Sequence, residues 1–70
     1  MNIWHDRKDY VMSVIAEADH EIKRIDGELQ RLSGPRSARR VQELIGQRGD
    51  EMRKWNKWNA VAWENDFYNA

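Results

Sequence analysis

Two side chains in the first half of the chain have the spacing of a metal-binding motif. Glu17 and His20 are three residues apart, which is the spacing with which helices of di-iron carboxylate bundles present two ligands. Such a site needs both ligands to face the bundle interior, together with carboxylates from neighbouring helices. Here the pair falls on the side of the predicted helix that points away from its apolar seam. We therefore expect a solvated charged face, with no metal ion and no cofactor.

The hydroxyl groups do not form a recognisable catalytic arrangement either. The serines are Ser13, Ser33 and Ser37; they fall in a predicted helix or turn, and none is placed beside a general base in a known order. A two-helix chain of 70 residues also has little room for a pocket of roughly a few hundred Å³. The sequence therefore predicts a protein that is not an enzyme.

Three arginines are crowded at the start of the predicted second helix. Arg36, Arg39 and Arg40 stand where the helix N-terminus already carries partial positive charge, so they do not favour the helix. Together with free backbone N–H groups they could bind an anion or the phosphates of a nucleic acid. The alternative is that they are solvated, or paired with Glu28 and Glu43. Both interpretations stay open.

Aromatic side chains are concentrated toward the two ends of the chain. Four of the 70 residues are tryptophan, which is several times its ordinary usage. Tryptophan buries a large area and supplies an N–H donor, so it is common both in small cores and at the centres of protein interfaces. We therefore weigh an aromatic core against a partner-binding surface. The candidate partner-binding residues are Trp4, Trp55, Trp58, Trp63, Phe67 and Tyr68.

The elements that position these residues follow from the apolar pattern. In the first half, apolar residues recur at alternating intervals of four and three, which is the pattern of a helix packed along another helix. The remaining positions are mostly charged. The pattern predicts a helix over about residues 5–32. Its seam comprises Val11, Ile15, Ala18, Ile22, Ile25, Leu29 and Leu32, and Trp4 extends the seam toward the N-terminus.

A turn is expected at residues 33–35, where Ser33-Gly34-Pro35 is the one cluster of turn-forming residues in the chain. Gly34 suits a left-handed cap at the end of the first helix, and Pro35 suits the first turn of the next element. Ser37 is a second candidate N-cap.

Helical spacing resumes after the turn and predicts a second helix over about residues 36–65, followed by a frayed aromatic tail at 66–70. Gly46 and Gly49 each weaken a helix by about 1 kcal/mol relative to alanine. They indicate either a break in this helix or, as we prefer, a close small-residue contact with the first helix near Ala18. The predicted seam comprises Ala38, Val41, Ile45, Met52, Trp55 and Ala62, widened by Leu44 and Trp58.

The predicted fold is all-α: an antiparallel two-helix hairpin, coiled-coil-like, within a single helical domain over residues 1–70. The apolar stripe of the second helix, from Trp58 to Trp63, spans an arc wider than one partner helix covers. We therefore expect the hairpin to form a homodimer, most simply as a four-helix bundle. The alternative is a three-helix monomer with a break near Gly46 and Gly49.

Composition limits the classes of function. The chain has no cysteine and carries twelve basic and twelve acidic side chains. Zero net charge argues against a strongly cationic nucleic-acid binder and against an acidic DNA mimic. The sequence shows no segment typical of a secretion signal or a membrane span, so we expect a cytoplasmic protein without membrane contact.

The predicted function is a small non-catalytic module that binds another protein, as an inhibitor or adaptor that occupies a surface of its partner. Compact chains of this kind are common among phage-encoded modulators of host machinery, which is an analogy only. Two alternatives remain: a nucleic-acid-binding hairpin that uses the arginines at the turn, and a structural subunit of an assembly.

Overall fold

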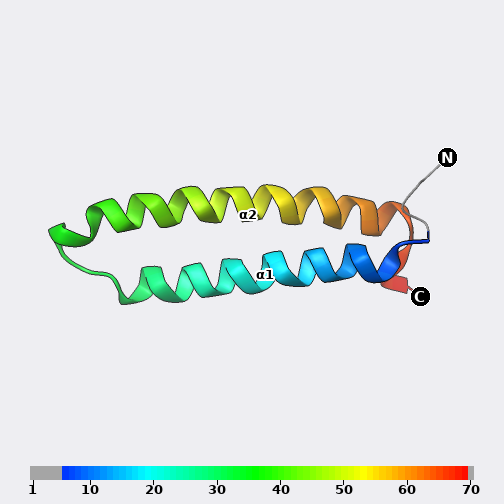
Figure 1. Ribbon diagram of the computed structural model, residues 1–70, viewed down its shortest axis with the longest axis horizontal. Coiled ribbons are helices and arrows are strands. Elements are labelled where there is room, and N and C mark those ends of the chain that lie inside the picture. Colours follow the sequence, from blue (N-terminus) through cyan, green and yellow to red (C-terminus); the bar gives the residue numbers. More distant parts are fainter. Residues whose placement is uncertain (1–5, 70) are drawn as a thin grey trace.

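The structure of the protein, a computed structural model, describes residues 6–69, which form a hairpin of two long helices (Figure 1). Helix α1 spans Lys8–Arg31 and helix α2 spans Ala38–Glu64. Two short 3₁₀ helices, η1 (Pro35–Ser37) and η2 (Phe67–Asn69), follow α1 and α2 respectively. Residues 6–69 contain no strand, so the prediction of an all-α hairpin is confirmed.

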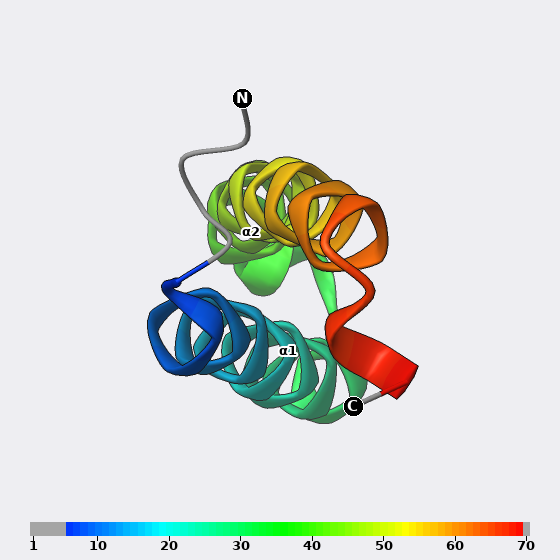
Figure 2. The ribbon, with the colours of Figure 1, turned by 90° about the vertical axis from the view of Figure 1, so that its right-hand side faces the viewer.

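The two helices lie side by side and antiparallel, and the molecule measures 51 × 19 × 14 Å (Figures 1 and 2). We call the end formed by residues 32–37 the turn end. The opposite end, where α1 begins and α2 ends, is the open end. Figure 2 looks onto the open end and shows η2 beside the two helices.

The apolar seam predicted for α1 is the face that α1 buries. Its buried residues recur at intervals of four and three, so they share one side of the helix. Leu29 and Leu32, at the turn end of the seam, are half-buried. The helix begins three residues later than predicted and stops one residue earlier, because Leu32 is extended at ψ 137°. The buried residues are Val11, Ile15, Ala18, Ile22 and Ile25.

The turn differs in detail from the predicted caps. Gly34 has φ 85° and ψ 165°, a conformation open essentially to glycine alone, but it lies beyond the end of α1 and does not cap it. Pro35 opens η1, as its fixed φ favours. Ser37 occupies the predicted N-cap position of α2, but its side chain does not cap the helix: its hydroxyl donates to the carbonyl of Ser33 (2.9 Å) and makes no hydrogen bond with an amide of α2.

Helix α2 is continuous from Ala38 to Glu64, so the alternative of a break near Gly46 and Gly49 is wrong. The preferred explanation, a close small-residue contact with α1, is also wrong. A Cβ on Gly46 would meet no atom within 4 Å, and one on Gly49 would meet only the Arg53 side chain at 3.6 Å. Neither glycine is required by the packing of the hairpin.

The tail after α2 is folded and not frayed. Asp66 adopts φ 59° and thereby turns the chain, and its N–H donates to the carbonyl of Trp63 (3.1 Å). The chain then continues into η2, whose first residue, Phe67, is only 7% exposed. The prediction of a frayed tail is therefore wrong for residues 66–69.

Candidate protein-contact surface

The aromatic residues near the open end divide into a core group and a surface group. Phe67 belongs to a buried cluster with Val11, Ile15 and Ala62. Trp55 and Trp58 are half-buried and pack against that cluster. Trp4 lies outside the described residues. Of the six predicted partner-binding residues, Phe67 is thus part of the core, where its ring is not accessible to a partner.

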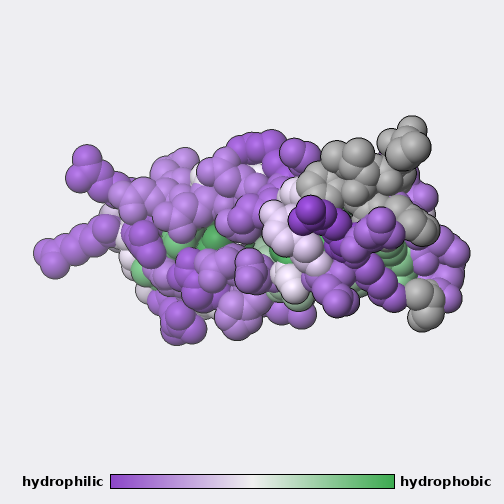
Figure 3. All heavy atoms as spheres, turned by 45° about the vertical axis from the view of Figure 1, so that its right-hand side comes forward, coloured by the Kyte–Doolittle hydropathy of each residue, from purple (hydrophilic) through white to green (hydrophobic). Residues whose placement is uncertain are grey.

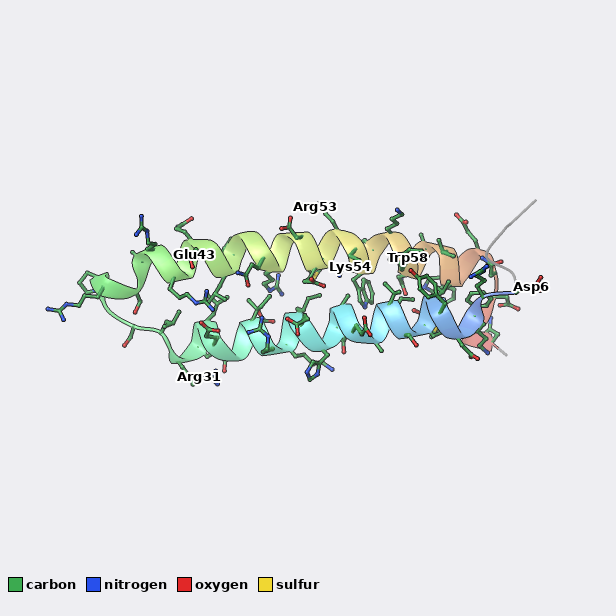
Figure 4. All side chains as sticks on the ribbon, viewed as in Figure 1. Asp6, Arg31, Glu43, Arg53, Lys54 and Trp58 are labelled. Carbon is green, nitrogen blue, oxygen red and sulfur yellow. The ribbon has the colours of Figure 1, made fainter. Side chains whose placement is uncertain are left out.

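Trp58 holds the open end together from one side of the hairpin. In Figure 4 it extends from α2 toward α1, whereas Arg53 points away. The ring of Tyr10 meets it edge-on, with centroids 5.7 Å apart and planes at 83°. The ammonium of Lys57 lies 5.6 Å from the centroid of Trp58, within cation–π range. The contact with Tyr10 connects α1 to α2 and gives Trp58 a structural role.

Trp63 and Tyr68 form the surface group. Trp63 is 61% exposed and Tyr68 is 40% exposed, and their ring centroids are 5.0 Å apart with planes at 50°. The phenol of Tyr68 donates to the side-chain oxygen of Asn59, one turn before Trp63 on α2. The tail thus holds Tyr68 against Trp63, and the two rings form an exposed aromatic pair in a fixed arrangement.

Ala38 and Ile45, which were predicted to lie in the seam of the second helix, are both exposed. The prediction put Ile45 in the seam and Leu44 on its flank. The structure reverses this assignment: Leu44 is fully buried and Ile45 is 52% exposed. The same step recurs at the open end, where Ala62 is fully buried and Trp63 exposed. Two adjacent apolar residues on α2 were the available signal, because only one of them can face α1.

Ile45 and Trp63 lie on the same side of α2. They are 18 residues apart, which is five turns at about 3.6 residues per turn. Gly49, Met52 and Asn56 fall within about 40° of the same line at 100° per residue. Gly49 and Met52 are half-buried, and Asn56 is exposed. We call Ile45, Gly49, Met52 and Trp63 the α2 face. Tyr68 adjoins it through Trp63.

Hydrophilic side chains border the apolar seam between α1 and α2 over most of the surface seen in Figure 3. Figure 3 shows mostly hydrophilic atoms in its view, with apolar atoms in a narrow strip between the helices. Among residues 6–69, the exposed large hydrophobic side chains are Ile45 and Trp63 on the α2 face, Tyr68 beside it, and Tyr10 on α1.

The arginines at the turn end are only partly available to an anion. Arg40 donates to both oxygens of Glu28, at 2.7 and 3.2 Å, and also to Glu43 at 3.3 Å. The hydrogen bond from Arg40 is the main reason that the pKa of Glu28 lies below its usual 4.5, and Glu28 in turn raises the pKa of Arg40. Arg36 and Arg39 are exposed, and neither forms an ion pair with another residue in the range 6–69. Of the two interpretations of these arginines, pairing with Glu28 and Glu43 is therefore correct for Arg40.

Glu17 and His20, the pair with the spacing of a metal-binding motif, lie on the surface of α1. Glu17 and His20 are exposed and line a shallow hollow with Ala16 and Glu21, all from one helix. Within the described part of the chain, no three histidine, aspartate or glutamate side chains converge in a way that could hold a metal ion.

The comparisons with known proteins supply no relative. No protein-family model matches the chain, and no curated protein or solved structure shows significant similarity to it. Among residues 6–69, neither helix combines the length and the apolar character that crossing a membrane requires.

Proposed function

We propose that the protein is a small non-catalytic module that binds another protein through the α2 face, as an inhibitor or adaptor. The observation that carries the proposal is the exposure of Trp63, 61%, in a side chain held in place by Tyr68. Exposed aromatic side chains with restricted motion are typical of the residues that dominate protein interfaces. Their rigidity lowers the entropy lost on binding.

Self-association is part of the proposal. The radius of gyration is 15.5 Å, whereas a compact chain of this length has about 11 Å. Packing two hairpins into a four-helix bundle would cover apolar side chains that one hairpin leaves exposed. A homodimer therefore remains the simplest assembly for this chain.

Affinity capture with the intact protein tests the protein-binding role. We expect the wild-type protein to retain a specific partner from native lysate, and Trp63→Ala to lose it while circular dichroism shows unchanged helicity. Arg36→Ala is the matched control, because Arg36 is exposed at the opposite end of the molecule and should leave capture unchanged. Equal capture by Trp63→Ala, or no capture by the wild-type protein, would contradict the proposal.

A nucleic-acid-binding role is the second candidate, and it rests on Arg36 and Arg39, which are exposed beside the start of α2. Trp63, which could stack on a base, lies at the other end of a molecule 51 Å long. Within one hairpin, the tryptophan that could stack on a base is therefore far from the arginines that could contact phosphates. This distance makes nucleic-acid binding the second candidate. Replacing both arginines by alanine should flatten any salt-dependent affinity for RNA or DNA.

A further inference from the structure

The residues of α2 that are exposed on the α2 face directly follow residues that contact α1. The two faces are therefore rotated from each other about the axis of α2. Ile45 directly follows the buried Leu44, and Trp63 directly follows the buried Ala62. One residue corresponds to about 100° around a helix. That angle is close to the right angle between the two neighbours of a helix in a four-helix bundle. A second helix packed on the α2 face would therefore not collide with α1.

We propose that a second copy of this chain covers the α2 face, with the two α2 helices antiparallel. Trp63 of each copy then packs against Ile45 of the other, and the two-fold axis passes near residue 54, midway between them. This inference rests on the proposed use of the α2 face as a contact surface, and it names a second copy as the occupant of that face when no other partner is bound. A partner protein that binds through Trp63 would displace that copy. The antiparallel dimer also explains why the two exposed apolar positions are five full turns apart.

The charge distribution favours this arrangement over a parallel one. Tyr10 lies opposite Trp58 and Glu28 opposite Arg40, so residue 54 is level with about residue 14. Residues 14–54, on the turn-end side of the two-fold axis, carry nine basic and eight acidic side chains, a net charge of +1. Residues 6–13 and 55–69, at the open end, carry three basic and four acidic side chains, a net charge of −1. In the antiparallel dimer each turn end lies beside the open end of the other copy, so opposite charges are adjacent. A parallel dimer would place like charges together.

Gly49 makes room on the α2 face. It lies one turn after Ile45, and a Cβ there would meet only the side chain of Arg53, which is 74% exposed. Glycine in the middle of a helix costs about 1 kcal/mol relative to alanine, and the hairpin gains no contact from it. In the dimer, the missing side chain leaves space next to Ile45 for the indole of Trp63 from the other copy.

The exposed area of the hairpin is also consistent with one missing partner. Its accessible surface is 5424 Å², whereas a compact protein of 8.4 kDa exposes about 4,600 Å². The excess of about 800 Å² equals the area that each partner loses in an interface of ordinary size. The hairpin therefore exposes enough area for one interface of ordinary size.

Cysteine cross-linking tests this geometry, because the sequence contains no cysteine and an introduced thiol is therefore the one site of reaction with a maleimide. Gly46→Cys and Ala60→Cys are both at exposed positions on one side of the α2 face. In the proposed dimer they lie within about 3 Å of each other along the helix axis, whereas two copies of Gly46 are about 24 Å apart. We expect a short bis-maleimide to join a mixture of the two variants but neither variant alone.

Adding Trp63→Ala to both cysteine variants should reduce the cross-linked product about tenfold or more, as for a residue central to an interface. Circular dichroism of these variants checks that the hairpin remains helical. Cross-linking of Gly46→Cys alone would indicate a parallel dimer and would overturn the proposal. An absence of product in the mixture, or product that is insensitive to Trp63→Ala, would also overturn it. Capture of another protein through Trp63 without this cross-link would leave the proposed function standing and the inference refuted.

Discussion

The two ends of the hairpin are held together by different interactions. At the open end, Phe67 and the half-buried tryptophans pack on Val11 and Ile15 in an apolar cluster. Toward the turn end, the seam narrows to aliphatic side chains such as Ile25 and Leu44. Ion pairs cross the helices there, with Arg40 on Glu28 and Arg48 on Asp26, each with a shortest N–O distance of 2.7 Å.

The two kinds of contact have different effects: one mainly stabilises the hairpin, and the other mainly aligns its two helices. Burial of aromatic side chains stabilises a fold by several kcal/mol per residue, whereas exposed ion pairs contribute little. Ion pairs between helices do, however, favour one alignment over its neighbours, since a shift of one residue would separate the charges. We therefore infer that the open end supplies most of the stability and that the charged pairs help to align α1 with α2.

The largest expected effect is at Phe67. Phe67→Ala removes a buried aromatic ring from the cluster at the open end, and should lower the free energy of unfolding by about 3–5 kcal/mol. Trp63→Ala is the matched control, because Trp63 is 61% exposed and four residues away. At low protein concentration it should change stability by about 0.5 kcal/mol. Urea denaturation measures both, and equal effects would show that the division between core and surface aromatics is wrong.

Two glycines near the turn end should respond to alanine with opposite signs. Gly34→Ala forces a side chain into a conformation at φ 85°, which costs about 1–3 kcal/mol. Gly46→Ala adds a methyl group where nothing lies within 4 Å and should stabilise the helix by about 1 kcal/mol. Thermal unfolding of both variants measures the difference. A loss of stability in Gly46→Ala would mean that α2 needs this glycine after all.

The turn before η2 offers a smaller effect at the open end. A left-handed conformation costs an ordinary residue about 1–2 kcal/mol, and Asp66 adopts it at φ 59°. Asp66→Gly should therefore keep or raise stability by up to about 1 kcal/mol, whereas Asp66→Val should lower it and expose Phe67. Hydrogen exchange of the first turns of α1 reports on this exposure. Identical behaviour of the two variants would argue against a strained turn at this position.

The smallest effect is the pH dependence of the ion pairs near the turn. Because the pKa of Glu28 is lowered in the folded protein by its hydrogen bond with Arg40, the stabilisation is present above its usual pKa of 4.5. It is lost as the pH falls through the lowered pKa and the carboxylate is protonated. Glu28→Gln should therefore lower the melting temperature at neutral pH and weaken its dependence on acid. An unchanged acid profile would show that the pair does not contribute.

The sequence predicted the hairpin well because both helices have a long apolar stripe and one turn cluster lies between them. The seam of α1 alternates with charged residues, which leaves only one face to bury. In α2, adjacent apolar residues such as Leu44 and Ile45 make the phase ambiguous, and the prediction chose the wrong member. The interpretation of Gly46 and Gly49 was also wrong, because helix propensity alone does not indicate which atoms surround a glycine.

The residues of the candidate site could be predicted from the sequence, but which of them are buried and which are exposed could not. Trp63 and Tyr68 were recognised as possible contact residues because aromatic side chains are concentrated near the chain end. Phe67 belonged to the same set, yet it is buried. The cause is the single left-handed residue Asp66, which folds the tail back. A conformation of this kind depends on tertiary contacts, and periodicity carries no information about it.

Sedimentation equilibrium of the intact protein tests most directly whether the α2 face is a contact surface. With rising concentration, the wild-type protein should approach twice its mass of 8.4 kDa, while Trp63→Ala should remain at the mass of one chain. A wild-type protein that stays at 8.4 kDa at every concentration would contradict self-association through this face.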